Sequence, residues 1–258
     1  MGSNKVTATV LAGGGSTRMG RNKALLRLGD KTMIERVVDP LRNIFDDILV
    51  VTNEPEEYNM LKGVKFVKDC VDAGKKSSLI GLYSGLKQSK TSHIFAIGCD
   101  MPFVNTELIK YMADLLKNED VIVPFSSNGS IEHIMDSLKN GNIDTRNKNV
   151  DIKSRNVGIK NRNADIKNRN MDIKNKNTDM VLPVRRYYQP LHAMYGKGCI
   201  PGFERLLKEG CYKIANIFED VNVKKIMEEE IKRLDPYMLC FKNINTYEEY
   251  EQILHFFE

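Results

Sequence analysis

Short apolar runs that lack a polar face alternate with helical segments through the first half of the chain. The runs predict strands at residues 6–11, 46–53, 64–70, 93–100 and 120–125. Apolar residues at helical spacing between them predict helices at 31–45, 77–89 and 105–118. A strand that is apolar on both faces is typical of a parallel sheet between two layers of helices. The sequence therefore predicts an α/β fold, a three-layer αβα sandwich with a mostly parallel, Rossmann-like sheet.

The last third of the chain continues the same kind of pattern. A strand is predicted at 187–198, a helix at 201–210 and a C-terminal helix at 244–257. Serine, threonine and asparagine side chains accept hydrogen bonds from the free N–H groups at the start of a helix. We therefore expect three helices to be capped by Ser77 or Ser78, by Asn105, and by Asn245 or Thr246.

A heptad repeat interrupts this pattern between Asp144 and Thr178, reading DTRNKNV, DIKSRNV, GIKNRNA, DIKNRNM and DIKNKNT. Each repeat offers one firmly apolar position, whereas a coiled coil needs two. Its nine asparagines also oppose a helix. We interpret it as a disordered insertion at about 140–180 in a surface loop. Residues 1–258 then form a single domain, because 223 residues remain without the 35 of the repeat.

The repeat also accounts for the positive charge of the chain. The sequence holds 39 Lys and Arg and 34 Asp and Glu, of which ten basic and four acidic residues lie in the repeat. The remaining 29 basic and 30 acidic residues make the rest of the chain nearly neutral. A nucleic-acid-binding function would therefore rest on the repeat alone, which has no aromatic residues for stacking, and we expect no nucleic-acid partner.

The sequence offers no sign of a membrane or of an oxidising compartment. No segment approaches the length and hydrophobicity of a membrane span, and the N-terminus lacks the apolar stretch of a signal peptide. The five cysteines are odd in number, scattered and free of Cys-x-x-Cys spacing. They indicate free thiols in a reducing cytoplasm, which is where we expect the protein.

The first predicted strand runs directly into the glycines Gly13–Gly15, and Arg18, Arg21 and Lys23 follow within ten residues. Glycines let backbone N–H groups approach a ligand, and bare amides beside cations suit a polyphosphate. The segment is neither a Walker loop nor a dinucleotide fingerprint, because Arg21 and Arg18 occupy positions that those motifs reserve for other residues. A glycine-rich turn with solvated cations is the alternative interpretation.

Three more polar residues follow predicted strands, namely Asn53, Asp69 and Asp100. Parallel sheets bind ligands at the carboxyl ends of their strands, so these side chains are predicted to share one edge with the glycine loop. Asp100 suits Mg²⁺, which takes one or two carboxylates together with phosphate oxygens. Lys23 and Arg18 suit the charge that develops in phosphoryl transfer. Each of these residues also has an ordinary interpretation as a turn, capping or solvated residue.

The segment VLAGGGSTRMGRNKALL resembles the Leu-Ala-Gly-Gly-x-Ser-x-Arg-Met-Gly-x-x-Lys signature of nucleotidyltransferases with the glycosyltransferase-A-like fold. Within that group the chain is most similar to the molybdenum cofactor guanylyltransferases, the MobA-like family. The similarity continues through Asn53, VKD ending at Asp69, GCDMPF with Asp100, QPLHAMY and FKNINTYEEY. It covers almost the whole chain except the repeat.

The resemblance implies a role for each matching position. Leu11, Ala12 and Gly13 would contact GTP through the backbone, with Gly14 nearby. Lys23 would bind the phosphates, Asn53 and Asp69 the guanosine, and Asp100 the Mg²⁺ ion. Arg18, Lys23 and Asp100 form the implied catalytic set, and the further matching positions are Gly20, Asn243, Asn245 and, more loosely, Lys213.

The implied reaction is attack by the terminal phosphate of molybdopterin on the α-phosphorus of GTP, with release of pyrophosphate. Mg²⁺ is the implied cofactor, and the implied partners are GTP, molybdopterin with or without molybdenum, and proteins that mature molybdoenzymes. Two alternatives stay open. One is a cytidylyltransferase or sugar-phosphate nucleotidyltransferase of the same fold, although the sequence Ala12-Gly13-Gly14 favours guanine. The other is a non-catalytic nucleotide-binding or scaffold protein.

Overall fold

A computed structural model describes residues 6–13, 22–71, 76–126, 187–254 and 256–257. Gly14, Arg18, Gly20 and the heptad repeat lie outside the described residues. The prediction of a disordered insertion therefore stays a prediction.

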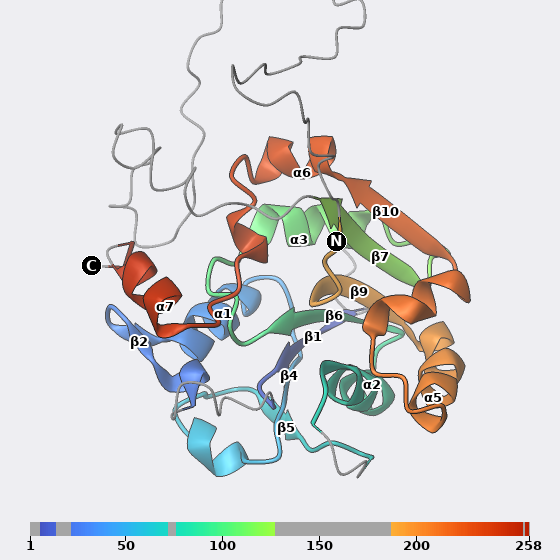
Figure 1. Ribbon diagram of the computed structural model, residues 1–258, viewed down its shortest axis with the longest axis horizontal. Helices are drawn as coiled ribbons and strands as arrows, with labels where there is room; N and C mark the ends of the chain where they lie inside the picture. Colours follow the sequence, from blue (N-terminus) through green and yellow to red (C-terminus); the bar gives the residue numbers. More distant parts are fainter. Residues whose placement is uncertain (1–5, 14–21, 72–75, 127–186, 255, 258) are drawn as a thin grey trace, which may run out of the picture.

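Among the described residues, eight strands form one sheet in the order β10-β7-β9-β6-β1-β4-β5, with β8 paired to β7 (Figure 1). The strands are β1 Val6–Leu11, β4 Ile48–Val51, β5 Lys65–Val67, β6 His93–Gly98, β7 Val121–Ser126, β8 Tyr187–Tyr188, β9 His192–Gly196 and β10 Val223–Met227. Strand β1 pairs in parallel with both β4 and β6, and β5 and β10 pair in parallel with β4 and β7. The mostly parallel sheet predicted from the sequence is thus confirmed.

Strand β9 is the exception to the parallel pattern, because it lies between β6 and β7 and runs antiparallel to both. The short strand β8 is also antiparallel to β7. The single strand predicted at 187–198 is therefore wrong in detail. It is divided into β8 and β9 by a turn, where the His192 N–H donates to the Gln189 carbonyl at 3.0 Å.

Helices cover both faces of the sheet and make it the middle of three layers (Figure 1). On one face lie α1 Met33–Leu41, α3 Thr106–Asp114 and α6 Glu228–Leu234. On the other face lie α2 Ser78–Gln88 and α5 Ile200–Lys208. This arrangement confirms the predicted three-layer sandwich.

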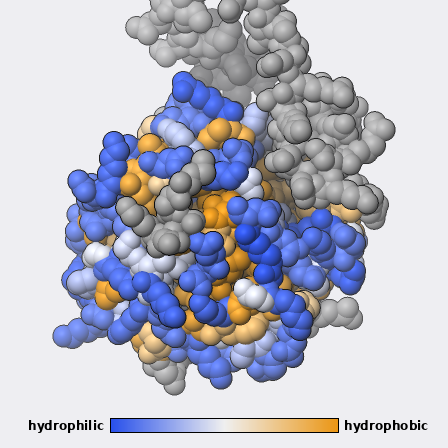
Figure 2. Space-filling model, turned by 180° about the vertical axis from the view of Figure 1, so that it is seen from behind, coloured by the Kyte–Doolittle hydropathy of each residue, from blue (hydrophilic) through white to orange (hydrophobic). Residues whose placement is uncertain are grey.

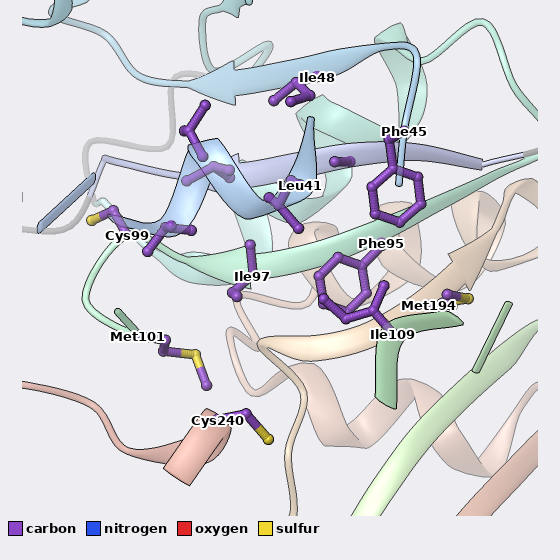
Figure 3. Close-up of a cluster of buried hydrophobic side chains, with 14 of the residues drawn as sticks. Leu41, Phe45, Ile48, Phe95, Ile97, Cys99, Met101, Ile109, Met194 and Cys240 are labelled. Atoms are coloured by element: carbon purple, nitrogen blue, oxygen red, sulfur yellow. The ribbon is translucent and has the colours of Figure 1, made fainter. Parts of the chain in front are cut away.

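The alternation of side chains along the strands supplies both cores at once. In β6, Phe95 and Ile97 point into the core beneath α1 and α3, whereas Ile94 and Ala96 point toward α2 and α5. Figure 3 shows the first of these cores, in which Phe95 stacks on Phe45 with ring centroids 5.9 Å apart. Because helices cover both faces of the strands in the middle of the sheet, neither face meets water and both can be apolar.

The predicted caps are found at the helix starts. The Ser77 hydroxyl accepts from the Ile80 N–H, and the Asn105 side chain accepts from the Leu108 N–H. Thr32 caps α1 in a capping box with Glu35, an arrangement that the sequence analysis did not specify. These bonds fix where each helix begins relative to the strand before it.

The C-terminal segment packs against an element that the sequence patterns missed. A short hairpin, β2 Arg27–Leu28 and β3 Lys31–Thr32, forms a separate sheet. Helix α7, Tyr247–Leu254, packs beside it, and Leu28, Ile244 and Ile253 share a third apolar cluster. The cap of α7 is Thr246, whose hydroxyl accepts from the Glu249 N–H. Strand β10 and helix α6 were also not predicted, because their charged residues interrupt the spacing of apolar residues by which a strand or a helix is recognised.

The surface is mainly hydrophilic, and Figure 2 shows apolar residues near the middle of one face with hydrophilic residues around them. All five cysteines are free thiols, as their spacing predicts. None of the helices described is long and apolar enough to span a bilayer.

Close approach between α2 and the sheet gives a prediction about stability. A Cβ atom at Gly85 would lie 2.5 Å from Thr9 Cγ2, whereas at Gly81 the nearest atom, Leu11 Cδ2, is 3.4 Å away. Replacing glycine by alanine in a helix favours folding by about 1 kcal/mol when there is room. We expect Gly85→Ala to lower the free energy of unfolding by about 1 to 3 kcal/mol in urea titrations. Gly81→Ala is the matched control and should be neutral or stabilising. A Gly85→Ala protein as stable as the control would contradict this account of the packing.

Candidate functional site

The carboxyl ends of the parallel strands meet at one edge of the sheet, and hydrogen bonds just beyond the strands hold them together. The Ala12 N–H donates to the Val51 carbonyl at 2.9 Å, and the Cys99 N–H donates to the Leu11 carbonyl at 3.1 Å. The chain segments that follow β1, β4 and β6 therefore leave the sheet side by side. A pocket of about 370 Å³ opens there.

The pocket gathers most of the described residues predicted from the sequence. Its lining includes Leu11, Ala12, Gly13, Lys23, Asp69 and Asp100. Asn53 does not line it, and Gly14 and Arg18 lie outside the part of the chain that the structure describes.

Lys23 and Asp100 form an ion pair in the wall of this pocket, although 77 residues separate them in sequence. The distance from Lys23 Nζ to Asp100 Oδ2 is 2.7 Å, and the two side chains are 18% and 17% exposed. Lys23 Nζ also donates to the Ile244 carbonyl at 3.3 Å and to Asn245 Oδ1 at 3.2 Å. The ammonium is thus held in place by three oxygens while it remains open to the pocket.

Asp100 owes its position to the end of β6 and to the C-terminal segment. The chain turns after Gly98, where the Met101 N–H donates to the Gly98 carbonyl, and this turn places Asp100 at the edge of the sheet. The Ile244 N–H then donates to the Asp100 carbonyl at 2.9 Å. The motif that contains Asn245 therefore closes one side of the pocket.

Asn53 and Asp69 form a reciprocal pair at the ends of β4 and β5. The Asn53 amide donates to Asp69 Oδ2 at 2.9 Å, and the Asp69 N–H donates to Asn53 Oδ1 at 3.0 Å. Because the Asn53 amide is occupied in this way, its contribution to the site is to orient the Asp69 carboxylate. Asp69 itself faces the pocket as a hydrogen-bond acceptor.

The backbone at Ala12 is less free than the sequence suggests. Its N–H is already donated to Val51, and its carbonyl accepts from the Tyr58 hydroxyl at 3.2 Å. Tyr58 also accepts from the Asn22 amide at 2.9 Å, and burial raises its pKa to about 12. Any new backbone donation to a ligand therefore begins at Gly13 and not at Ala12.

Several lining residues were not identified from the sequence, among them Asn22, Ser77, Ser78 and Leu191. Asn22 carries a recognisable signal, because its side chain caps the short 3-10 helix η3, Lys23–Leu25, by accepting from the Ala24 N–H. That cap fixes the backbone immediately before Lys23. The two serines could have been found from their predicted place at the start of α2.

Burial keeps two side chains, Cys99 and His192, in their uncharged forms at neutral pH. Burial is the main cause that raises the pKa of the Cys99 thiol to about 12, and the nearby Asp100 carboxylate adds to it. Burial lowers the pKa of His192 to about 3, and its ring meets Phe95 and Phe241 edge to face. Within the described residues neither of its ring nitrogens has a hydrogen-bond partner. Both side chains are therefore packing residues, as their sequence context indicated.

The oxygen atoms in the pocket are suited to Mg²⁺. Nowhere in the described ranges do three or more His, Cys, Asp or Glu side chains gather as a metal site. Two carboxylates, Asp69 and Asp100, line the pocket. They match the preference of Mg²⁺ for one or two carboxylates plus phosphate oxygens and water. The described lining holds no histidine, and its one cysteine, Cys99, has a thiol pKa that burial raises to about 12, so this donor set argues against a site for a transition metal.

The fold has close counterparts among solved structures. The molybdopterin-guanine dinucleotide biosynthesis protein A of Archaeoglobus fulgidus superposes with a TM-score of 0.62 at 19% identity, covering 96% of this chain and 97% of the other. The 2-C-methyl-D-erythritol 4-phosphate cytidylyltransferase of Thermus thermophilus superposes with a TM-score of 0.59 at 12% identity, covering 96% of both chains. These likenesses show the fold, an α/β domain of the kind that nucleotidyltransferases have.

The sequence comparisons specify the family. The model of the MobA-like NTP transferase domain matches residues 8–224. A protein of Natranaerobius thermophilus named "Probable molybdenum cofactor guanylyltransferase" is 28% identical over 253 residues, which cover 97% of this chain and 95% of the relative. The chain belongs to the MobA-like NTP transferase family.

The buried, uncharged His192 gives a prediction about pH. Its pKa in the folded protein, about 3, lies below the value of 6.5 that it takes when exposed, so the unfolded chain binds the proton first. The contribution of this pKa shift to the free energy of unfolding is fully present above pH 6.5 and is lost as the pH falls from there toward 3. Between pH 7 and 5 this loss should be about 2 kcal/mol. We expect His192→Phe to lack this part of the pH dependence in urea titrations, and parallel profiles for the two proteins would refute the assignment.

Proposed function

We propose that this protein is a molybdenum cofactor guanylyltransferase, which transfers GMP from Mg²⁺-bound GTP to molybdopterin. The observation that carries the proposal is the Lys23–Asp100 ion pair in the wall of a pocket that Gly13 also lines. A metal-bound triphosphate needs a cation for its oxygens and a carboxylate for its metal, and here the two groups stand together, 2.7 Å apart. The names of the relative from Natranaerobius thermophilus and the structure from Archaeoglobus fulgidus support the choice of guanine and of molybdopterin.

In the proposed reaction an oxygen of the acceptor's terminal phosphate forms a bond to the α-phosphorus of GTP. The bond between the α-phosphorus and the oxygen that bridges to the β-phosphorus breaks, and pyrophosphate leaves with the electron pair. The products are molybdopterin guanine dinucleotide and pyrophosphate. Because the nucleophile is already an anion, no side chain has to remove a proton. This agrees with a pocket lining that contains no histidine among its described residues.

The side chains of the pocket then act by position and charge. Lys23, held by Ile244 and Asn245, would bind the phosphates and offset the negative charge that builds up on the leaving pyrophosphate. Asp100 would hold Mg²⁺, which when bound supplies positive charge to the phosphate oxygens. Arg18, Gly14 and the backbone contacts of Leu11 and Ala12 belong to the proposal from the sequence motif. Because the Ala12 N–H is donated to Val51, a hydrogen bond from this backbone to GTP would come from Gly13.

Asp69 supports guanine over cytosine as the base. A carboxylate only accepts hydrogen bonds. The pairing edge of guanine presents two neighbouring N–H donor groups, whereas that of cytosine presents one donor beside two acceptors. With Asn53 fixing its orientation, Asp69 is matched to the guanine edge. A cytidylyltransferase remains the main competing function, because the Thermus thermophilus cytidylyltransferase shares the fold.

The test is turnover of purified protein with each nucleoside triphosphate, Mg²⁺ and molybdopterin. We expect GTP to be used and CTP to be used poorly. Asp100→Asn should lower kcat by about 100-fold or more with GTP, since it removes a charge that the reaction requires. Asp114→Asn, at an exposed position on α3, is the matched control and should retain activity. Turnover with CTP in place of GTP, or full activity of Asp100→Asn, would overturn the assignment.

We further propose that residues 1–258 form one domain and that the repeat is dispensable for catalysis. Surface loops accept long insertions at small thermodynamic cost. Deleting residues 144–178 should leave kcat and the KM for GTP within about threefold of the full chain. The measurement also separates the enzyme from a scaffold protein that acts through its basic repeat. Loss of turnover in a deletion variant that still binds GTP would favour the scaffold.

A further inference from the structure

Helix α7 begins with a carboxylate, Glu249, that makes more contacts than a helix cap requires. In the capping box, the Glu249 N–H donates to the Thr246 hydroxyl and the Thr246 N–H donates back to Glu249 Oε2, both at 3.2 Å. The same Oε2 also accepts from the Asn245 N–H at 2.7 Å, and Glu249 Oε1 accepts from Lys242 Nζ at 2.6 Å. The contacts to Asn245 and Lys242 lie outside the capping box, so capping alone does not account for them.

These donors keep the Glu249 carboxylate charged and fixed in place. The side chains of Lys242 and Glu249 are 19% and 27% exposed, so both ends of their ion pair are largely shielded from water. Burial raises the pKa of Glu249, but the hydrogen bonds from Lys242 and from the backbone of Asn245 and Thr246 outweigh it, and the pKa is lowered overall. Hydrogen bonds to an ionised carboxylate are stronger than those to a neutral oxygen. The carboxylate is therefore a firm anchor for the segment that precedes α7.

The anchored segment is the one that holds Lys23. A trans peptide group joins Ile244 to Asn245, so its N–H and its carbonyl point in opposite directions. The N–H, which belongs to Asn245, donates to Glu249, and the carbonyl of Ile244 accepts from Lys23 Nζ at 3.3 Å. The Asn245 side chain accepts from the same ammonium at 3.2 Å. One peptide group thus connects Glu249 on one side with Lys23 on the other.

The other contacts of the segment leave the orientation of this peptide to Glu249. The Ile244 side chain is fully buried in the cluster that contains Leu28 and Ile253, which fixes how deeply the segment lies. The Ile244 N–H belongs to the preceding peptide and donates to the Asp100 carbonyl at 2.9 Å. Rotation of the following peptide would turn the Ile244 carbonyl away from Lys23, and the bond from its N–H to Glu249 opposes that rotation.

We propose that Glu249 is a positioning residue for the phosphate site, which acts through the Ile244–Asn245 peptide on Lys23. Neither Glu249 nor Lys242 is among the described residues that line the pocket, so the effect on a bound phosphate is indirect. This inference rests on the proposed function and deepens it, since the phosphates that Lys23 would bind are those of the nucleotide. The position of the ammonium matters, because a displacement of about 1 Å in such a site can cost about 100-fold in rate.

The test measures the Kd of inorganic pyrophosphate with Mg²⁺ by isothermal titration calorimetry, which probes the phosphate site without a base or an acceptor. Glu249→Gln keeps the size of the side chain but only one oxygen, which cannot serve both Lys242 and the backbone amides. We expect this variant to raise the Kd about fivefold or more, although loss of a negative charge would by Coulomb attraction alone lower it. Glu251→Gln, at an exposed position on the same helix, is the matched control and should change the Kd by less than about twofold.

A second background separates positioning from a general effect on the fold. Lys23→Met removes the group through which Glu249 acts, so adding Glu249→Gln to it should change the Kd by less than about twofold. A general effect on the fold would instead raise the Kd by the same factor with and without Lys23. Glu249→Asp keeps the charge on a shorter side chain and covers the case in which Glu249→Gln does not fold. It should also raise the Kd, whereas its control Glu251→Asp should not.

Three results would overturn the inference. They are variants at Glu249 that bind pyrophosphate as tightly as the matched variants at Glu251, a loss of binding that is equal with and without Lys23, and wild-type protein that binds no pyrophosphate. Turnover of GTP by the wild type is measured separately, so the proposed function can stand when the inference fails. Conversely, a loss of pyrophosphate binding that depends on Lys23, in a protein that does not turn over GTP, would refute the proposed function and support the positioning role.

Discussion

The parallel pairing of β1 with both β4 and β6 is the constraint on which the rest of the molecule depends. In this register Leu11 lies opposite Val51 on one side and Gly98 on the other, so that three strands end at the same level. Parallel strands all deliver their carboxyl ends to one edge, and the chain must leave the sheet there in turns. The polar residues of the site occupy those turns, and their positions follow from the register.

The ion pair between Lys23 and Asp100 places a cation and a carboxylate together at this edge of the sheet. Each partner neutralises the other in the ligand-free protein, which makes it less costly to keep both charges half-buried at the pocket. Asn245 and Ile244 hold the ammonium from the C-terminal side. A segment more than 200 residues away from the glycine loop in sequence therefore helps to build the same pocket. In the proposed complex, the metal and the triphosphate would replace this internal pairing with pairing to the ligand.

Two pockets that share Ser78 and Leu191 lie side by side, one of about 370 Å³ at the ends of β1 and β6 and one of about 500 Å³ lined from β7, β8 and the 3-10 helix at Ile214–Glu219. The first combines charge, backbone and the Asp69 acceptor, whereas the second is aromatic and mainly apolar. The antiparallel strand β9 is what makes this division possible. By separating β6 from β7, it sets the aromatic residues at the end of β7 to one side of Asp100.

The sequence by itself determined the class of fold, the main strands and helices, and the edge at which Lys23, Asp69 and Asp100 lie. It could do so because apolar periodicity, helix caps and the turn after each strand are local properties of the chain. Only the tertiary structure decided the direction of β9, the place of β10 and α6, and the contact between Lys23 and Asn245. These depend on contacts between segments far apart in sequence. For the same reason the structure alone revealed that Asn53 orients Asp69, that the Ala12 amide is already bonded, and that Ser78 stands between two pockets.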